Sequence, residues 1–372
     1  MTKQSEIDRF IANITRCMPG IDWTERINLD IKGIVASKPI KAILLASPGN
    51  DEIDLFEKFV VEILAKHGIT HLVLRVGYHF EFLSHPEVVE QPALSQANAG
   101  RIARICCDNG IILVPKMNLF GHQSDTNKVP FGIIRAYPDM EEITGEDIAY
   151  CRCLCLSHPD LKPLVYDLMD EMLQVFGSDH FHIGQDEAFE IGKCPRCIGK
   201  PNEVIYADWL NALHDHLAEK HVKTWLWGDR LINGTIMPER GIGYETSLVD
   251  TWKAVSRVPR DFMICDWHYR VLPYGHMSPA YWDKHGFDFI VCPFNNMCAA
   301  DQLIVAAQAA DSVHFQGVFD TTWSRFTTFV QAVYDLYPKY LVDHEIDEYA
   351  YEPGQEPPCY NEACVFLHLF VR

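Results

Sequence analysis

The sequence has few basic residues and no cluster of them. Its 372 residues include 32 Lys and Arg against 51 Asp and Glu, which gives a formal net charge of −19 and a pI near 5.3. Proteins that bind nucleic acid usually carry a basic patch, and this charge would repel a polyanionic substrate. The composition therefore argues against nucleic acid as a partner and favours a small neutral molecule.

Long apolar runs are also missing. No apolar stretch reaches the roughly 18 residues that a transmembrane helix requires. The polar residues 1–17 do not have the basic start and apolar core of a secretory signal. An odd number of cysteines, 13, in a long chain without such a signal is typical of reduced thiols rather than of a disulfide scaffold. We therefore expect a cytoplasmic protein without a membrane partner.

A glycine-rich G-x-G-x-x-G turn is absent after the first apolar run, which argues against a dinucleotide site. What the chain has is an alternation of short apolar runs and helical segments. Eight runs have the length and composition of buried strands: residues 41–46, 71–76, 111–115, 180–184, 223–227, 262–265, 288–292 and 317–321. Helical periodicity is found over residues 5–17, 51–67, 97–109, 161–176, 204–221, 301–310 and 328–336.

Eight alternating units predict an α/β fold in which a parallel sheet closes into a (β/α)8 TIM barrel. The alternative is an open doubly wound sheet, which usually has fewer strands. We predict three segments: a helical extension at residues 1–38, a catalytic barrel at 39–338 and a C-terminal tail at 339–372. The tail would pack on the barrel or on the partner subunit of a homodimer.

In such a barrel the functional groups lie at the carboxyl ends of the strands. Those ends carry carboxylates, aromatic rings, a histidine and an amide: His122, Asp186, Glu187, Trp227, Asp229, Trp267, Tyr269, Asn295 and Trp323. Carboxylates serve acid–base chemistry, aromatic faces cover the C–H surface of a sugar, and amides and phenols bind hydroxyls. The set indicates a carbohydrate site. The alternative interpretations are a surface Asp-Glu pair at a helix start, core tryptophans and a structural histidine.

The cysteines suggest a second site. Cys194 and Cys197 form a C-x-x-C motif, and Cys151, Cys153 and Cys155 lie in the preceding strand–helix loop, which is its neighbour in a barrel. Four thiolates from two adjacent loops could bind a structural zinc ion. Free thiols or a redox-labile pair are the alternatives. The chemistry of the carbohydrate site requires no metal.

The segment of residues 182–187, His-Ile-Gly-Gln-Asp-Glu, resembles the His-x-Gly-Gly-Asp-Glu signature of glycoside hydrolase family 20, the β-N-acetylhexosaminidases. Residues 114–122, which end in Gly-His, residues 225–229 and residues 317–323, which end in Trp, are similar to other family segments in the same order. The resemblance covers about residues 41–338. Within the family the chain is most similar to the short cytosolic hexosaminidase D branch.

The resemblance implies an exo-acting hydrolase that removes terminal non-reducing β-linked GlcNAc or GalNAc. Glu187 would be the general acid that protonates the glycosidic oxygen and then the base that activates water. Asp186 would bind the N–H of the substrate's 2-acetamido group, whose oxygen attacks C1 and forms an oxazoline. Such substrate-assisted retaining catalysis uses no cofactor and no second carboxylate as nucleophile. The alternatives are a non-catalytic carbohydrate-binding barrel and a barrel glycosidase for a different sugar.

The chain departs from the family pattern where the rest of the sugar would be recognised. Residues 46–49 stand in place of an Asp and a substrate-binding Arg, while Lys116 and Asn118 replace acidic residues. Arg325 stands where a Glu is usual, and Gln185 replaces the second Gly of the signature. We therefore expect the chemistry of the acid pair to be kept and the recognition of the sugar's hydroxyls to be changed.

The acetamido oxygen would also be held differently. In typical family members a Tyr from strand seven binds this oxygen, whereas the present strand seven is followed by Asn295 and Asn296. Tyr269, after strand six, is the other candidate.

Overall fold

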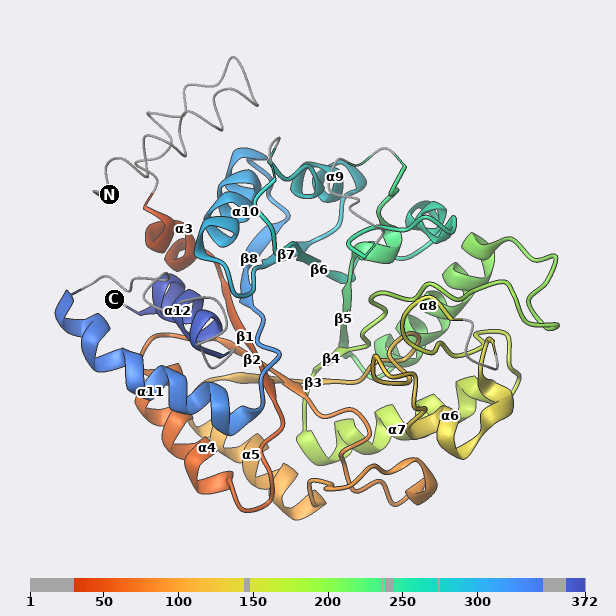
Figure 1. Cartoon of the computed structure of the whole chain (residues 1–372), viewed down its shortest axis with the longest axis horizontal. Coiled ribbons are helices and arrows are strands. Elements are labelled where there is room, and N and C mark those ends of the chain that lie inside the picture. Colours follow the sequence, from red (N-terminus) through yellow and green to blue (C-terminus); the bar gives the residue numbers. More distant parts are fainter. Residues whose placement is uncertain are drawn as a thin grey trace.

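The computed structural model describes residues 30–143, 148–235, 237, 244–272, 275–343 and 359–371. Within them, eight parallel strands form a closed barrel in chain order, β1 to β8, with helices around it (Figure 1). This architecture confirms the predicted (β/α)8 TIM barrel and excludes the open doubly wound sheet. The helix predicted at residues 5–17 lies outside the described residues.

The strands form where the apolar runs predict them, and their ends differ from the predicted ends by at most two residues. They are Ile40–Ala46 (β1), His71–Arg75 (β2), Ile112–Lys116 (β3), His180–His182 (β4), Lys223–Trp227 (β5), Met263–Trp267 (β6), Phe289–Cys292 (β7) and Phe315–Asp320 (β8). Most of their residues are buried because helices cover the outer face of the sheet and the inner face points into the barrel. Both faces therefore select apolar side chains.

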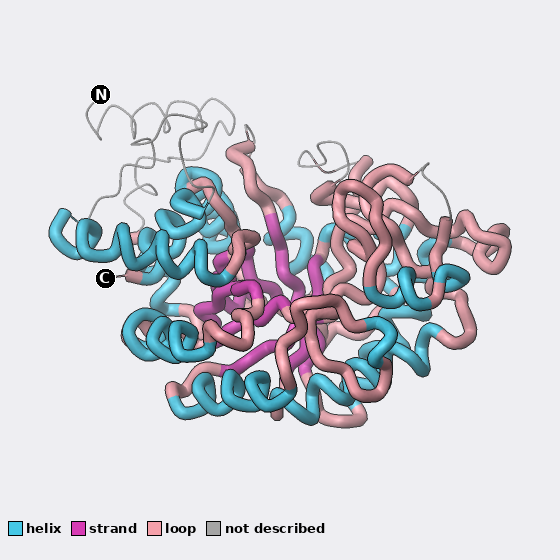
Figure 2. Tube along the Cα trace, turned by 60° about the horizontal axis from the view of Figure 1, so that its bottom comes forward, coloured by secondary structure: helices cyan, strands magenta, loops and turns pink. Residues whose placement is uncertain are grey.

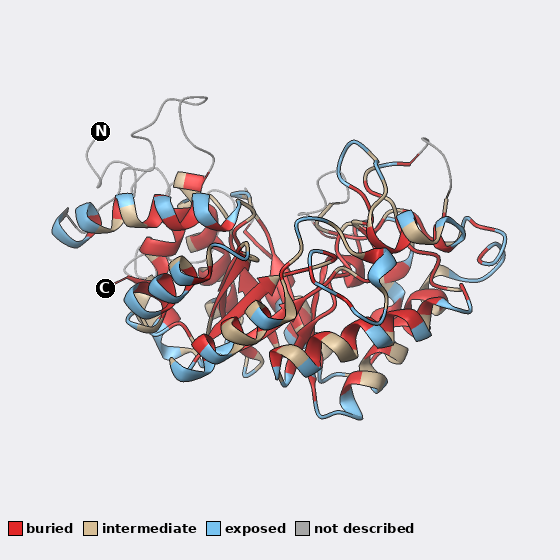
Figure 3. Ribbon diagram, turned by 90° about the horizontal axis from the view of Figure 1, so that it is seen from below, coloured by how far each residue is buried: buried red, intermediate tan, exposed pale blue. Residues whose placement is uncertain are grey.

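The six helices predicted after the first strand are all present. They are Ile53–Phe59 (α4), which continues as the π-helical turn Val60–Ala65 (η1), Gln96–Asp108 (α5), Leu161–Phe176 (α7), Asn202–Ala218 (α8), Met297–Ala309 (α10) and Phe326–Asp343 (α11). Their buried residues pack on the outside of the barrel, where Figures 2 and 3 show strands at the centre and exposed positions on the outer faces of the helices.

Several elements were not predicted from the sequence: most contain too few residues to show a helical period, and the helix Cys359–Phe370 is apolar on most sides. The short helices are Ile31–Ser37 (α3), Gly132–Ala136 (α6), Ser278–His285 (α9) and Cys359–Phe370 (α12). The 3-10 turns are Pro86–Val88 (η2), Pro138–Met140 (η3), Asp229–Leu231 (η4) and Thr251–Ser256 (η6). Between β5 and β6 the described residues form η4 and η6 in place of an outer α-helix. No helix among the described residues is long and apolar enough to span a membrane.

The C-terminal helix α12 packs against α11, α3 and α10 of its own chain (Figure 1). Its buried Glu362 accepts hydrogen bonds from the backbone N–H groups of Trp323 and Ser324, at 3.3 and 3.4 Å. The described part of the tail therefore lies on the barrel and reaches the loop that follows β8. The boundaries of the three predicted segments stay predictions.

A second, smaller apolar core fills the barrel itself and forms the floor of the strand ends. It contains side chains from most of the strands, among them Leu44, Val73, Val114, Trp227 and Phe319. The rings of Trp227 and Phe319 stack at a centroid distance of 5.5 Å with an interplanar angle of 2°. Wide aromatic residues thus close the barrel axis directly below the carboxyl ends of the strands.

Candidate active site

A cavity of about 1340 Å³ opens at the carboxyl ends of the strands. Seven of the nine predicted site residues line it: His122, Asp186, Glu187, Trp227, Trp267, Tyr269 and Trp323. The other two, Asp229 and Asn295, are not among its lining residues. The barrel therefore brings together side chains from loops that are far apart in the sequence, as the strand-end rule predicts.

The acid pair, Asp186 and Glu187, lies in a sharply turned segment after β4. Three residues of this segment have positive φ: Gly184 at 73°, Gln185 at 89° and Glu187 at 49°. Gly184 has no room for a side chain, because a Cβ there would lie 2.3 Å from Asn118 Oδ1. Because of this turn, the two neighbouring side chains reach the same cavity instead of pointing to opposite faces, as they would in a strand.

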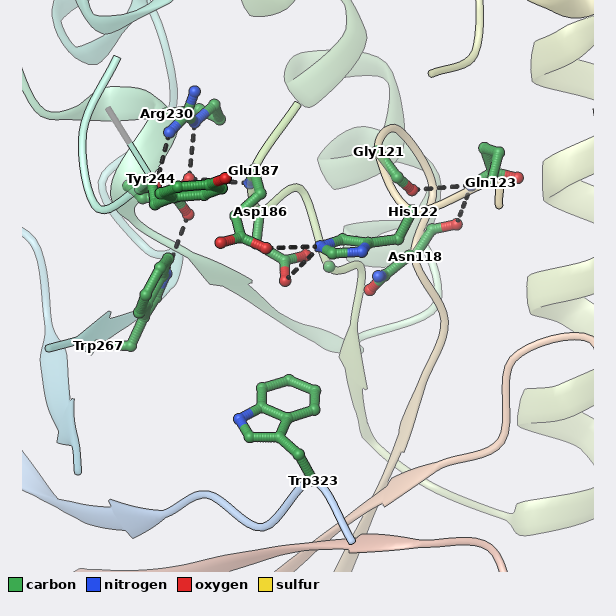
Figure 4. Close-up of polar contacts among 12 residues, drawn as sticks. Asn118, Gly121, His122, Gln123, Asp186, Glu187, Arg230, Tyr244, Trp267 and Trp323 are labelled. Atoms are coloured by element: carbon green, nitrogen blue, oxygen red, sulfur yellow. Dashed lines mark hydrogen bonds and ion pairs between the residues drawn. The ribbon is translucent and has the colours of Figure 1, made fainter. Parts of the chain in front are cut away.

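Both carboxylates of the acid pair meet one histidine (Figure 4). Nε2 of His122 lies 3.2 Å from Asp186 Oδ2 and 3.2 Å from Glu187 Oε2. Burial alone would lower the pKa of His122, but the charge of Asp186 and the hydrogen bonds to Asp186, Cys151 and Glu187 together outweigh burial and raise it well above its usual value. His122 therefore carries a positive charge between the two carboxylates.

The two members of the acid pair have opposite pKa shifts. Burial would raise the pKa of Asp186, but the charges of His122 and Lys116 hold it below its usual range. The pKa of Glu187 is raised, by burial first and then by the negative charge of Asp186. Asp186 is thus fixed as a carboxylate, whereas Glu187 can keep its proton to a higher pH. One group can hold a cation and the other can transfer a proton.

Asp229 lies behind the acid pair rather than on the cavity. Its Oδ2 accepts a hydrogen bond from the backbone N–H of Glu187 at 3.0 Å, and its Oδ1 accepts one from Trp267 Nε1 at 3.1 Å. The guanidinium of Arg230 donates to Oδ2 at 2.6 Å and balances the buried charge. In this structure Asp229 therefore positions Glu187 and Trp267, and its predicted contact with substrate stays a prediction.

Aromatic side chains form one wall of the cavity. The ring centres of Trp267 and Tyr269 lie 5.0 Å apart, and Trp323 Nε1 donates a hydrogen bond to the Tyr269 hydroxyl at 3.1 Å. The neighbouring hydroxyl of Thr321 is 3.3 Å from that oxygen and gives its own proton to the carbonyl of Pro293 at 2.6 Å. The phenol oxygen of Tyr269 thus accepts a hydrogen bond from Trp323, and its hydroxyl lies at the cavity.

Asn295 was the other predicted partner for an acetamido oxygen. It is partly exposed and does not line the cavity. Its neighbour Asn296 begins α10, where its side chain accepts a hydrogen bond from Ala299 N at 2.8 Å. Of the two candidates, Tyr269 is therefore the one that lines the cavity.

Two cations line the cavity at the ends of β3 and β2, and Lys116 pairs with His182 on the strand that leads to the acid pair. Lys116 is fully buried, and its Nζ donates to Asn118 Oδ1 at 2.5 Å and lies 5.7 Å from the ring centre of Trp227. Burial lowers the pKa of Lys116 to about 8, against the opposing effect of Asp186. Arg75 donates to the carbonyl of Trp323 at 3.1 Å. Of the two, Lys116 stands where the family pattern has an acidic residue.

Some lining residues were missed by the sequence analysis. Arg75 ends β2 and was within reach of the same strand-end rule that identified the others. Tyr150 comes from the long loop after β3, where no strand end marks it. Its ring packs edge-on against the rings of His122 and Tyr244, with ring centres 5.8 and 5.4 Å away. Glu362 comes from the tail; it does not line the cavity but holds the backbone N–H groups of Trp323 and Ser324 beside it.

The predicted cysteine site is present in a changed form. One ligand atom each of Glu142, Cys155, Cys194 and Cys197 lies within 4.8 Å of the others, and all four residues are buried. We call this group the cysteine cluster. Cys151 and Cys153 do not belong to it: the side chain of Cys151 contacts His122, and Cys153 Sγ lies 3.6 Å from the carbonyl of Cys151.

Known proteins were compared with the chain. The family model described as glycosyl hydrolase family 20, catalytic domain, matches residues 70–346. No curated protein matches the chain. Solved structures similar to it include a Flavobacterium johnsoniae chitobiase, at 15% identity and a TM-score of 0.61, over 90% of this chain and 48% of that one. An exo β-N-acetylglucosaminidase from Vibrio harveyi matches at 13% identity and a TM-score of 0.58, over 88% of this chain and 54% of that one.

These structural likenesses concern the fold, since the identities are low. The chain spans about half the length of both of these relatives. A third structure, a β-N-acetylhexosaminidase, matches at 14% identity and a TM-score of 0.61, over 88% of this chain and 71% of that one. The family model, in contrast, covers β2 through α11 and includes the acid pair and the aromatic wall. The protein therefore belongs to glycosyl hydrolase family 20.

Proposed function

We propose that the protein is an exo-acting β-N-acetylhexosaminidase that removes terminal, non-reducing β-linked GlcNAc or GalNAc by substrate-assisted retaining hydrolysis. The observation that carries this proposal is the electrostatic difference within the acid pair. Asp186 and Glu187 share His122 at 3.2 Å, yet the pKa of Asp186 is lowered and that of Glu187 is raised. Different roles for two adjacent carboxylates follow from this difference.

In the first step, Glu187 gives its proton to the glycosidic oxygen as the bond between that oxygen and C1 breaks. The oxygen of the 2-acetamido group attacks C1 and closes an oxazoline ring, which carries a positive charge. Asp186 holds the acetamido N–H and stabilises this charge, and the hydroxyl of Tyr269 lies at the cavity as a donor for the acetamido oxygen before it attacks. An ionised Asp186 can therefore stabilise the oxazoline cation, whereas a protonated Asp186 could not.

In the second step, Glu187 is a carboxylate and takes a proton from water. The hydroxide oxygen attacks C1 from the face that the leaving group occupied, and the oxazoline opens to restore the acetamido group. Glu187 is again protonated, so the configuration at C1 is retained and the enzyme is unchanged. Its raised pKa suits both roles, since each turnover needs Glu187 to lose and regain a proton near neutral pH. The hydrolysis uses no cofactor.

The bound sugar would lie against the aromatic wall and under the cations. Trp227, Trp267 and Trp323 offer faces for the C–H surface of a pyranose. Lys116 and Arg75 offer only donors, so the sugar's oxygens would be recognised as acceptors on that side. This arrangement differs from the acidic recognition typical of the family and supports a changed preference at the 3-, 4- and 6-hydroxyls.

Further properties belong to the same proposal. The Trp323-x-Arg325 segment after β8 supports a place in the hexosaminidase D-like branch. The described cysteines are all free thiols, which supports action in the reducing cytoplasm. A homodimer is supported by the exposed Leu341 and Val342 at the end of α11, and analytical ultracentrifugation would test it.

Turnover of simple substrates tests the proposed activity. The wild-type enzyme is expected to release 4-nitrophenol from the β-GlcNAc or β-GalNAc glycoside and to have at least about 10³-fold lower kcat/KM for the β-glucoside, which lacks the acetamido nucleophile. Turnover of none of the three would contradict a catalytic role and favour a sugar-binding barrel. Equal turnover of the glucoside would indicate a direct nucleophile instead.

A further inference from the structure

The cysteine cluster joins the two loops that carry the acid pair and His122. Cys155 ends the long loop after β3, and Glu142 lies earlier in the same loop. Cys194 and Cys197 lie in the loop between β4 and α8. All four side chains are buried, and no ordinary packing need brings three thiols and a carboxylate together away from water.

The spacing of the sulfur atoms corresponds to ligands of one ion and not to a disulfide. Cys155 Sγ lies 3.2 Å from Cys194 Sγ and 3.8 Å from Cys197 Sγ. A disulfide would need about 2.05 Å between two of them. Sulfur ligands at about 2.3 Å from a tetrahedral zinc ion are roughly 3.8 Å apart. The three sulfurs thus already surround a volume that suits a single small cation.

Glu142 is oriented as a fourth ligand. One of its oxygens, Oε1, accepts hydrogen bonds from the backbone N–H groups of Lys193 and Cys194, at 2.7 and 3.0 Å. The other oxygen, Oε2, faces the sulfurs and lies 3.3 Å from Cys197 Sγ. Hydrogen bonds that fix one oxygen of a carboxylate and leave the other for the ion are typical of the support around metal ligands.

We propose that the cysteine cluster binds one structural zinc ion through Cys155, Cys194, Cys197 and Glu142. Three thiolates and a carboxylate oxygen make a closed tetrahedral set, with no position left for water or substrate. The ion would neutralise part of the buried negative charge and would replace the thiol protons. This site is separate from the hydrolytic chemistry and does not depend on it.

The zinc ion would hold the loop that carries Tyr150 against the loop that carries the acid pair. Other contacts also join them: Glu190 Oε1 accepts a hydrogen bond from Ala149 N at 2.8 Å, and the ring centres of Tyr150 and Phe189 lie 6.2 Å apart. Both loops are long connections with little regular structure, α6 and η3 in the first, and such connections cost entropy to order. The ion therefore acts as a clamp behind the active site, and its removal should loosen the walls of the cavity.

The metal content of the purified full-length protein tests the proposal. Plasma mass spectrometry after dialysis in metal-free buffer is expected to find about one zinc ion per chain in the wild type. Cys155→Ser and Cys197→Ser should reduce this content at least fivefold. Cys153→Ser is the matched control, because Cys153 is a buried thiol of the same loop outside the cluster, and it should keep its zinc.

X-ray absorption at the zinc edge keeps the test decisive if a variant fails to fold, since it needs only the wild type. The expected spectrum has three sulfur neighbours at about 2.3 Å and one oxygen near 2.0 Å. A wild type without zinc after growth and reconstitution with zinc chloride would overturn the proposal, as would a spectrum of nitrogen and oxygen neighbours only. Two thiols missing from a titration of the metal-free, denatured protein would instead identify a disulfide and also overturn it.

Discussion

The loops after β3 and β4 carry two polar clusters with opposite access to solvent. In the active-site cluster, the side chains of His122, Asp186 and Glu187 keep 22%, 10% and 17% of their exposure and line the cavity. The cysteine cluster is buried and lines no part of that cavity. The open active-site cluster can transfer a proton to a substrate, whereas the buried side chains of the cysteine cluster can only hold the two loops together. Chemistry and stability are therefore separable within one pair of loops, and substitutions in each cluster test this separation.

The largest effect on chemistry is expected from Glu187→Gln. The amide keeps the shape of the side chain but cannot give a proton to the glycosidic oxygen, so kcat should fall about 10³- to 10⁴-fold. The melting temperature should stay close to that of the wild type, because a group with a raised pKa contributes no ionic stabilisation near neutral pH. Steady-state kinetics and calorimetry measure both. A loss of less than tenfold in kcat would contradict the acid–base role.

The reverse pattern is expected from Cys194→Ser in the cysteine cluster. Removal of one buried ligand should lower the free energy of unfolding by on the order of 3 kcal/mol, measured by urea denaturation. At a temperature where both proteins are folded, kcat should change less than about tenfold, because no proposed step uses the cluster. A variant with normal stability and a Glu187→Gln-like loss of kcat would break the distinction between the two clusters.

The sequence predicted the fold and most of the active-site cluster for physical reasons. Buried parallel strands are continuous apolar runs, and the barrel then places Asp186, Trp227 and Trp323 at one end. Tyr150 and Glu142 could not be found in this way, because they come from an irregular loop with no periodicity. Glu362 was missed because its contact joins the tail to β8 across a long separation in the chain.

The turn of the acid pair was also invisible in the sequence. The second Gly of the family signature suits a positive φ, and Gln185 at 89° gives no sequence signal for that conformation. Asp229 was assigned to the substrate because it ends a strand, but the turn places the Glu187 backbone between it and the cavity. Strand ends identify the correct layer of the barrel, and loop geometry decides which groups of that layer face inward.

A smaller effect, on the pH profile, is expected from His122→Gln. Wild-type activity should fall as the pH rises through the pKa of Glu187, and it should persist at low pH until Asp186 is protonated. Without the histidine cation the pKa of Asp186 rises, and loss of its hydrogen bond raises that of Glu187 further. Both limbs of the kcat/KM profile should move to higher pH, by about one unit. An unshifted profile would show that His122 does not set the charges of the acid pair.

The smallest effect is expected from Glu362→Gln, which acts on the cavity wall from outside. The amide of Gln accepts the hydrogen bonds from the N–H groups of Trp323 and Ser324 more weakly than the carboxylate does. KM should therefore rise about threefold, or ~0.7 kcal/mol, with kcat unchanged. His368→Gln is the matched control on α12, because His368 contacts Asp301 of α10 instead of the wall. An equal effect of both variants on KM would assign the loss to helix packing.

Inhibition by the thiazoline analogue of the oxazoline tests the central claim, substrate-assisted catalysis by the acid pair, most directly. The analogue should bind the wild type at least 10²-fold more tightly than the substrate, since it resembles the reactive intermediate. Asp186→Asn should weaken its binding by about tenfold or more, because the carboxylate that holds the ring nitrogen is lost. No inhibition of the wild type, together with a covalent glycosyl–enzyme adduct formed by a 2-fluoro glycoside, would contradict the account.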